Sequence, residues 1–165
     1  DLAKYLEQVQ LSRAPFLIVH GNYLRPRSVP AGAFVVYCPI AHHFFGHPEH
    51  PVLELLQEGV RVALGSDSAA SGDTIDVLSE TKFLGRARPD LDARAVFRMA
   101  TEWGARALDL DTGVLHVGRP ADLAAFTPDL GPSVLGHTDA KCIFACVGGR
   151  VAYQDPDHDG SAATD

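Results

Sequence analysis

The segment RVALGSDSAASGD, residues 61–73, begins as an apolar run and continues into small and acidic residues. Val62, Ala63 and Leu64 are typical of a strand covered on both faces, as in a parallel sheet wrapped by helices. An isolated carboxylate such as Asp67 is costly to bury unless hydrogen bonds, a cation or a metal compensate it. Its small neighbours leave room for a ligand. Asp67 is therefore either part of a binding site or the start of a turn or helix cap.

Two earlier apolar runs also end in polar side chains. FLIVH, residues 16–20, ends at His20, and AFVVYCP, residues 33–39, is followed by His42. The order of strands and helices along the chain predicts a parallel α/β fold. In such folds the chemistry lies at the carboxyl ends of the strands. We therefore expect these polar groups and Asp67 to share one edge of the sheet.

The periodicity of apolar residues predicts the other elements. Helices are expected over 2–11, 51–60, 74–87 and, as one helix or as a broken pair with Gly104 as a weak point, 91–108. Beyond residue 112 the pattern changes to short strand-like pieces broken by Gly and Pro, at 113–126 and 141–153. The predicted organisation is an α/β part over 1–112, β-strands over 113–153 and a disordered tail over 154–165.

Composition limits the class of protein. The chain has 165 residues, is 46% hydrophobic and carries 14 basic against 21 acidic residues, a net charge of -7. This balance argues against nucleic acid or an anionic membrane as the main partner. No apolar stretch approaches the roughly 18 residues of a membrane span, and we expect a cytoplasmic protein. Cys38, Cys142 and Cys146 form no CxxC pair and are expected to be reduced.

Other polar residues have plainer interpretations. His47 and His50 flank Pro48-Glu49 at a helix entrance, where they are expected to cap the helix or lie in solvent, with a second metal site as the alternative. The acidic residues at the start of the helix over 74–87 suit its dipole and are expected to be solvated; they are Asp73, Asp76 and Glu80.

Five ordered motifs resemble the C-terminal half of the amidohydrolase superfamily, in its cytosine deaminase and chlorohydrolase-like branch. They are LIVHGNYL (17–24), VVYCPIAHHFFGH (35–47), GVRVALGSDSAAS (59–71), MATEWGARAL (99–108) and GVLHVGRPADLAAF (113–126). The resemblance implies a distorted (β/α)8 barrel with a flanking β-sandwich, of which this chain supplies barrel strands six to eight and sandwich strands. It also implies a missing N-terminal half as partner and leaves a homodimer open.

The resemblance also implies roles at the sheet edge. Asp67 matches the strand-eight aspartate that binds one divalent metal and shuttles protons, and His20 matches the strand-six histidine that polarises the hydroxide or the substrate. Zinc is the favoured metal, with iron or manganese as alternatives. The family's HxH pair, strand-five histidine and acidic glutamate have no counterpart here and are expected upstream of Asp1, so that this piece alone lacks a complete metal site.

The segment CPIAHHFFGH, residues 38–47, resembles the form found in aminodeoxyfutalosine deaminase-like members. By that likeness His42 replaces an asparagine that faces the substrate, and Ser68 is a further expected substrate contact. Gly72 stands where another asparagine is usual.

The resemblance implies hydrolytic deamination of a purine-like heterocycle by a metal-activated water, with this fragment inactive alone. Two alternatives stay open: hydrolysis of another C–N or C–Cl bond, as in triazine or guanine-type enzymes, and a non-catalytic barrel fragment that serves as a binding scaffold.

Overall fold

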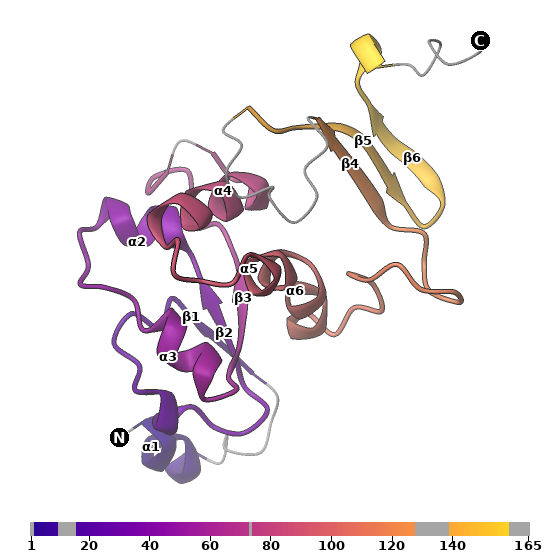
Figure 1. Ribbon diagram of the computed structural model, residues 1–165. Helices are drawn as coiled ribbons and strands as arrows, with labels where there is room; N and C mark the ends of the chain where they lie inside the picture. Colours follow the sequence, from indigo (N-terminus) through magenta and orange to yellow (C-terminus); the bar gives the residue numbers. More distant parts are fainter. Residues whose placement is uncertain (1, 10–15, 73, 128–138, 159–165) are drawn as a thin grey trace.

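The computed structural model describes residues 2–9, 16–72, 74–127 and 139–158 (Figure 1). Its α-helices are α1 Leu2–Gln8, α2 Pro39–Phe44, α3 Val52–Gln57, α4 Val77–Ala87, α5 Ala93–Ala100 and α6 Glu102–Ala107. Short 3-10 helices cover Pro26–Ser28 and Pro156–His158. The strands are β1 Leu17–Val19, β2 Phe34–Tyr37, β3 Arg61–Leu64, β4 Leu123–Thr127, β5 Lys141–Val147 and β6 Arg150–Gln154.

The first three strands form a parallel sheet in the order β1-β2-β3. Ile18 pairs with Val35 and Val35 with Val62, so these three side chains point to the same face. The α/β character of the fold is thus confirmed. The numbering of these strands as six to eight of a barrel stays a prediction.

Helices cover one face of this sheet. Buried apolar side chains from β2, β3, α3, α4 and α5 form one cluster, which includes Val35, Tyr37, Val52, Leu55, Val62, Leu64, Leu84, Val96 and Met99. The opposite face is less covered at β1, where Leu17 and Val19 are exposed. The sheet therefore has a helix-packed side and a side that is open at β1.

The predicted helix over 91–108 is a pair. α5 and α6 meet at Thr101, whose backbone has φ -123° and ψ -92°, outside the helical region. The break lies three residues before Gly104, which is inside α6. Helix α2 was not predicted, because its sequence PIAHHF has no amphipathic repeat.

The second sheet is antiparallel, in the order β4-β5-β6. β5 and β6 form a hairpin around Gly148 and Gly149, whose φ values of 56° and 79° suit a tight turn. Lys82 Nζ of α4 donates a hydrogen bond of 3.2 Å to the Ala140 carbonyl beside β5. Figure 1 shows this sheet beside the α/β part; its membership of a β-sandwich stays a prediction.

The segment predicted as strand-like over 113–126 is strand only in β4, and residues 113–122 are irregular. The predicted boundary at residue 112 falls before this irregular stretch, and the domain division itself stays a prediction. The first part of the tail that was expected to be disordered has regular structure: Gln154 ends β6, and Pro156–His158 form a 3-10 helix. The rest of that tail, from residue 159, lies outside the described residues.

Gly113 is expected to tolerate no side chain. Its φ is 82°, and a Cβ there would lie 2.8 Å from Ala105 Cβ and 2.8 Å from the Thr101 carbonyl oxygen. Gly113→Ala should lower the free energy of unfolding by about 2 kcal/mol, through left-handed strain and the clash together. Gly118→Ala is the matched control, since its φ is 89° and nothing lies within 4 Å. Equal urea midpoints for the two variants would contradict the clash.

Across the described residues, no helix combines the length and the apolar character that a membrane crossing requires.

Candidate functional site

His20 and Asp67 come together at the carboxyl edge of the parallel sheet. His20 directly follows β1 and Asp67 lies three residues after β3. Nε2 of His20 is 4.0 Å from Oδ2 of Asp67, and the two side chains are 42% and 34% exposed. The structure thus joins two residues that are 47 positions apart, in an arrangement that a small molecule can reach.

The backbone of His20 has an uncommon conformation. Its φ is 66°, in the left-handed region, which costs a residue with a Cβ about 1–2 kcal/mol. Two backbone hydrogen bonds and one from a side chain surround it: His20 N donates to Val36 O at 2.8 Å, Gly21 N donates to Val19 O at 3.0 Å, and the His20 carbonyl accepts from the side chain of His50, at 2.8 Å from its Nε2. The chain therefore turns sharply at His20 and is held there.

The carboxylate of Asp67 is fixed by a residue that sequence reasoning treated only as small. Ser71 is buried, and its hydroxyl donates to Asp67 Oδ2 at 3.1 Å and also lies 3.1 Å from the Ser68 carbonyl. Ser68, expected as a substrate contact, is exposed, and its hydroxyl accepts from Ala70 N at 3.4 Å. The loop after β3 therefore folds back on Asp67. The spacing of Ser71 four residues after the acid was the available signal.

His42 lies in α2, in a cluster of aromatic and imidazole rings. Its Nε2 donates to the Pro48 carbonyl at 2.8 Å, and its ring lies 5.5 Å from that of His47 and 5.7 Å from that of His50. Burial lowers its pKa below the usual value. His42 is thus linked to the His20 turn through His50.

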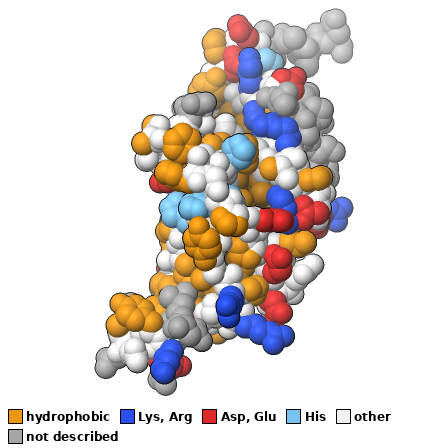
Figure 2. All heavy atoms as spheres, turned by 90° about the vertical axis from the view of Figure 1, so that its left-hand side faces the viewer, with side chains coloured by type: hydrophobic (Ala, Val, Ile, Leu, Met, Phe, Trp, Pro, Cys, Tyr) orange, Lys and Arg blue, Asp and Glu red, His pale blue; other side chains and the backbone are white. Residues whose placement is uncertain are grey.

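An exposed apolar surface accompanies this cluster. Figure 2, which looks onto the left-hand side of Figure 1, shows imidazole side chains beside apolar ones. Tyr23, whose hydroxyl bonds His47 Nδ1 at 3.1 Å, is exposed, as are Phe44 and Phe45 at the end of α2. His43 is exposed and packs on Phe83 of α4, with ring centroids 5.3 Å apart.

The expectation that His50 caps a helix or lies in solvent is wrong. His50 is only 2% exposed, and its ring stacks on Tyr37 at 3.8 Å with an interplanar angle of 15°. The N-cap of α3 is Pro51 instead. Burial lowers the pKa of His50 to about 4, so the ring is neutral near pH 7. Because a carbonyl oxygen can only accept, its Nε2 carries the proton that bonds His20.

The acidic residues before and within α4 divide into different roles. Asp76 caps the helix by accepting from the backbone N of Leu78 and Ser79. Glu80 is 2% exposed, which corrects the expectation that it is solvated. Its Oε2 accepts from Ile40 N at 2.9 Å and so ties α4 to the start of α2. Burial raises the pKa of Glu80 above its usual value. Asp73 lies outside the described residues.

The environment of Cys38 does not favour a nucleophilic thiolate. The side chain is buried, and burial raises the pKa of its thiol to about 12, with Glu80 and Asp67 adding in the same direction. The thiolate is the nucleophilic form, so a protonated, buried thiol is inert near pH 7.

The described residues provide one ligand position for a metal and not a complete site. A carboxylate oxygen suits Zn²⁺, and Asp67 offers one beside an imidazole. Within those ranges, no group of three or more His, Cys, Asp or Glu side chains is arranged to hold a metal ion. The alternative of a second metal site at His47 and His50 thus finds no support among these residues.

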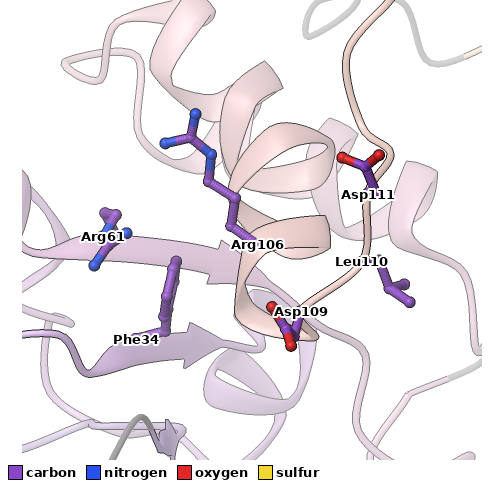
Figure 3. Close-up of a pocket in the computed structure, with 6 residues that line it drawn as sticks. All are labelled: Phe34, Arg61, Arg106, Asp109, Leu110 and Asp111. Carbon is purple, nitrogen blue, oxygen red and sulfur yellow. The ribbon is translucent and has the colours of Figure 1, made fainter. Parts of the chain in front are cut away.

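A cavity of about 330 Å³ lies elsewhere, at the amino ends of the parallel strands (Figure 3). Phe34 and Arg61 line it from the first residues of β2 and β3, and Arg61 stacks over the Phe34 ring at 4.3 Å. Arg106 of α6, Leu110 and two aspartates complete the lining. The carboxyl edge, with His20 and Asp67, is at the opposite end of the strands.

Chemically, the carboxyl edge offers an accessible imidazole beside an accessible carboxylate. Such a pair can position a polar group, move a proton and stabilise a developing negative charge. These are the elements of hydrolytic chemistry, in which a water molecule is activated and an oxyanion is held.

Comparison with known proteins places this chain in a family. The sequence pattern of the Amidohydrolase family matches residues 2–151. A 5-methylthioadenosine/S-adenosylhomocysteine deaminase of Pyrococcus abyssi is 34% identical over 160 residues, which cover 88% of this chain and 37% of that protein. A protein of the same name from Halobacterium salinarum is 36% identical, over 73% of this chain and 31% of the relative. The chain thus spans well under half the length of these relatives.

Solved structures agree with the fold. An adenosine deaminase from Xanthomonas campestris with bound zinc has a TM-score of 0.77 at 26% identity, over 92% of this chain and 40% of that one. The atrazine chlorohydrolase TrzN from Arthrobacter aurescens TC1, complexed with zinc, has a TM-score of 0.78 at 23% identity, over 92% and 39%. The resemblance found in the five sequence motifs is confirmed, and the chain belongs to the amidohydrolase family.

Proposed function

We propose that the intact protein hydrolytically removes an amino group from a purine-like heterocycle. The observation that carries this proposal is the accessible His20–Asp67 pair, 4.0 Å apart at the carboxyl edge of the sheet. Relatives named as deaminases support the type of reaction. The roles of the individual residues are part of the proposal.

Asp67 would contribute one ligand to a divalent metal, with zinc favoured because two similar structures contain it. The other ligands would come from residues beyond those described. When bound, such a metal lowers the pKa of a coordinated water to about 7. Ser71 would keep the Asp67 carboxylate oriented through the bond at 3.1 Å.

The residues of this chain would then act on protons and charge. Water adds to the ring carbon that carries the amino group, and Asp67 accepts one of its protons. His20 donates a hydrogen bond to the oxyanion that develops on the substrate. Asp67 returns the proton to the amino group, the C–N bond breaks and ammonia leaves. The second proton of the water passes to the neighbouring ring nitrogen, which leaves a ring carbonyl.

We infer an adenine nucleoside as the substrate class, since the relatives are named for 5-methylthioadenosine, S-adenosylhomocysteine and adenosine. His42 and Ser68 would contact the substrate from α2 and from the loop after β3. The FGH form of the segment over 38–47 adds aminodeoxyfutalosine as a candidate. The remainder of the barrel would cover the sheet face on which Leu17 and Val19 are exposed. A cytoplasmic location and a homodimer stay predictions.

A substrate panel tests the proposal. The intact, metal-loaded protein should release ammonia from one or more of 5-methylthioadenosine, S-adenosylhomocysteine, adenosine and aminodeoxyfutalosine, with a kcat/KM at least about a hundredfold above that for guanine, because pockets that bond a polar group reject analogues strongly. A chlorotriazine should release no chloride. Chloride release without ammonia release would favour the alternative C–Cl chemistry, and turnover of none of these compounds would favour a binding scaffold.

A further inference from the structure

The histidine at position 50 combines a buried position with a single side-chain hydrogen bond. Within the described residues, its Nδ1 has no partner, and its Nε2 donates to the carbonyl of His20 at 2.8 Å. Its ring stacks flat on Tyr37. A phenyl ring would stack on Tyr37 equally well and would leave no buried nitrogen without a partner. What an imidazole adds at this position is therefore the bond to residue 20.

That bond reaches the backbone at its least regular point. The His20 carbonyl belongs to the residue whose φ is 66°, and the next amide, Gly21 N, turns back to Val19 O at 3.0 Å. A conformation of this kind persists only where the surroundings hold it. The direction of the Cα–Cβ bond of His20, and hence the path of its imidazole toward Asp67, depends on this turn.

The support for His50 comes from the core. Tyr37 belongs to the buried cluster and its neighbour in the sheet is Leu64, while the His50 carbonyl accepts from Val52 N at 2.8 Å and from Arg88 at 3.3 Å. Tyr37 of β2 thus fixes the ring of His50. Val52 of α3 and Arg88, the residue after α4, fix its backbone carbonyl. A rigid donor is what a strained turn requires.

From this geometry we propose that His50 is a positioning residue, which holds the His20 carbonyl so that the His20 imidazole is directed at the Asp67 carboxylate. This inference rests on the proposed function, in which His20 acts on the substrate. His50 would not touch the substrate; it would keep the His20 imidazole directed at Asp67.

The test compares three replacements in the intact protein with its metal, and 5-methylthioadenosine is the substrate. His50→Gln places an amide donor near the position of Nε2, His50→Asn places one near Nδ1, and His50→Phe keeps only the stacked ring. The glutamine variant should keep kcat within about threefold of the parent protein. The asparagine and phenylalanine variants should lose about tenfold or more in kcat, with KM changed less than about threefold.

A second readout is independent of turnover. His20–Gly21 is the one His-Gly pair in this sequence. In intact protein labelled with carbonyl-¹³C histidine and ¹⁵N glycine, the backbone NMR signal of this pair is identified by its loss in His20→Ala, whatever His-Gly pairs lie elsewhere in the protein. Its carbonyl shift should move in the asparagine and phenylalanine variants and return in the glutamine variant. Val96→Ala, in α5 of the same core cluster, is the matched control and should leave the shift and kcat unchanged.

The outcomes separate the two proposals. If His20→Ala retains activity, the proposed function of His20 fails, and the carbonyl shift alone still decides whether His50 holds the turn. If His20→Ala is inactive while His50→Asn and His50→Phe keep full kcat and an unmoved shift, the positioning role is overturned. Equal losses for the glutamine and asparagine variants would also overturn it, since a purely structural histidine has no preference between the two donor positions. If the phenylalanine variant does not fold, the comparison of glutamine with asparagine carries the test.

Discussion

Asp67→Asn is expected to lower the turnover of the intact protein by about a thousandfold or more, because the amide can neither accept the proton nor bind a cation as a charged ligand. The replacement keeps the shape of the side chain and an oxygen that can accept the hydrogen bond from the Ser71 hydroxyl, which lies 3.1 Å from Oδ2. Metal content, measured by elemental analysis after gel filtration, should fall together with activity.

Asp92→Asn is the matched control for this change. Asp92 caps α5 by accepting from Arg94 N, and asparagine caps a helix about as well as aspartate. The same loss of one negative charge should therefore leave metal content and turnover unchanged. Full metal content and normal turnover in Asp67→Asn would reject the role of Asp67, and an equal loss in Asp92→Asn would reduce it to an effect of net charge.

The sheet edge was predictable from the sequence because each of its strands is local. Val62, Ala63 and Leu64 form an apolar run that stops at small and acidic residues, and His20 ends another such run. Strand ends in a parallel sheet share one edge, so that a pattern of a few residues is enough to predict that His20 and Asp67 are neighbours. The distance of 4.0 Å does not follow from the register alone, because β2 lies between β1 and β3; it also depends on the turn at His20 and on the loop after β3.

The supports of that edge were not predictable, because they depend on contacts between distant segments. His50 is 30 residues from His20, and nothing in the sequence around it indicates that its ring stacks on Tyr37. Glu80 has the helix-start position of a solvated acid, yet it bonds Ile40, 40 residues away. Residues 113–122 show the opposite failure: short strand-like pieces broken by Gly and Pro were predicted there, whereas the stretch is irregular and has positive φ at Gly113 and Gly118.

Stability should fall in acid because His50 is buried in its neutral form. Its pKa is about 4 in the folded chain, against an ordinary value of 6.5. Between these two pH values the unfolded chain binds the proton and the folded chain does not, so that the free energy of unfolding decreases as the pH falls. The contribution is absent above pH 6.5 and reaches about 3 kcal/mol near pH 4, at 1.4 kcal/mol per pKa unit.

His50→Gln isolates this contribution, since it keeps a donor for the His20 carbonyl and does not titrate. Urea unfolding of the intact protein at pH 7 and at pH 4.5 should show a loss of stability about 2–3 kcal/mol larger for the parent protein than for the variant. The neighbours of His50 titrate in both proteins: His42, whose pKa burial lowers, acts in the same direction, and Glu80, whose pKa burial raises, acts in the opposite one. The positive charge of Arg88 is also present in both, so the difference between the proteins removes these effects. Equal losses in the two proteins would mean that folding does not change the pKa of His50. The ring would then take up a proton inside the fold below pH 6.5, and the donor to the His20 carbonyl would be a charged imidazolium at that pH.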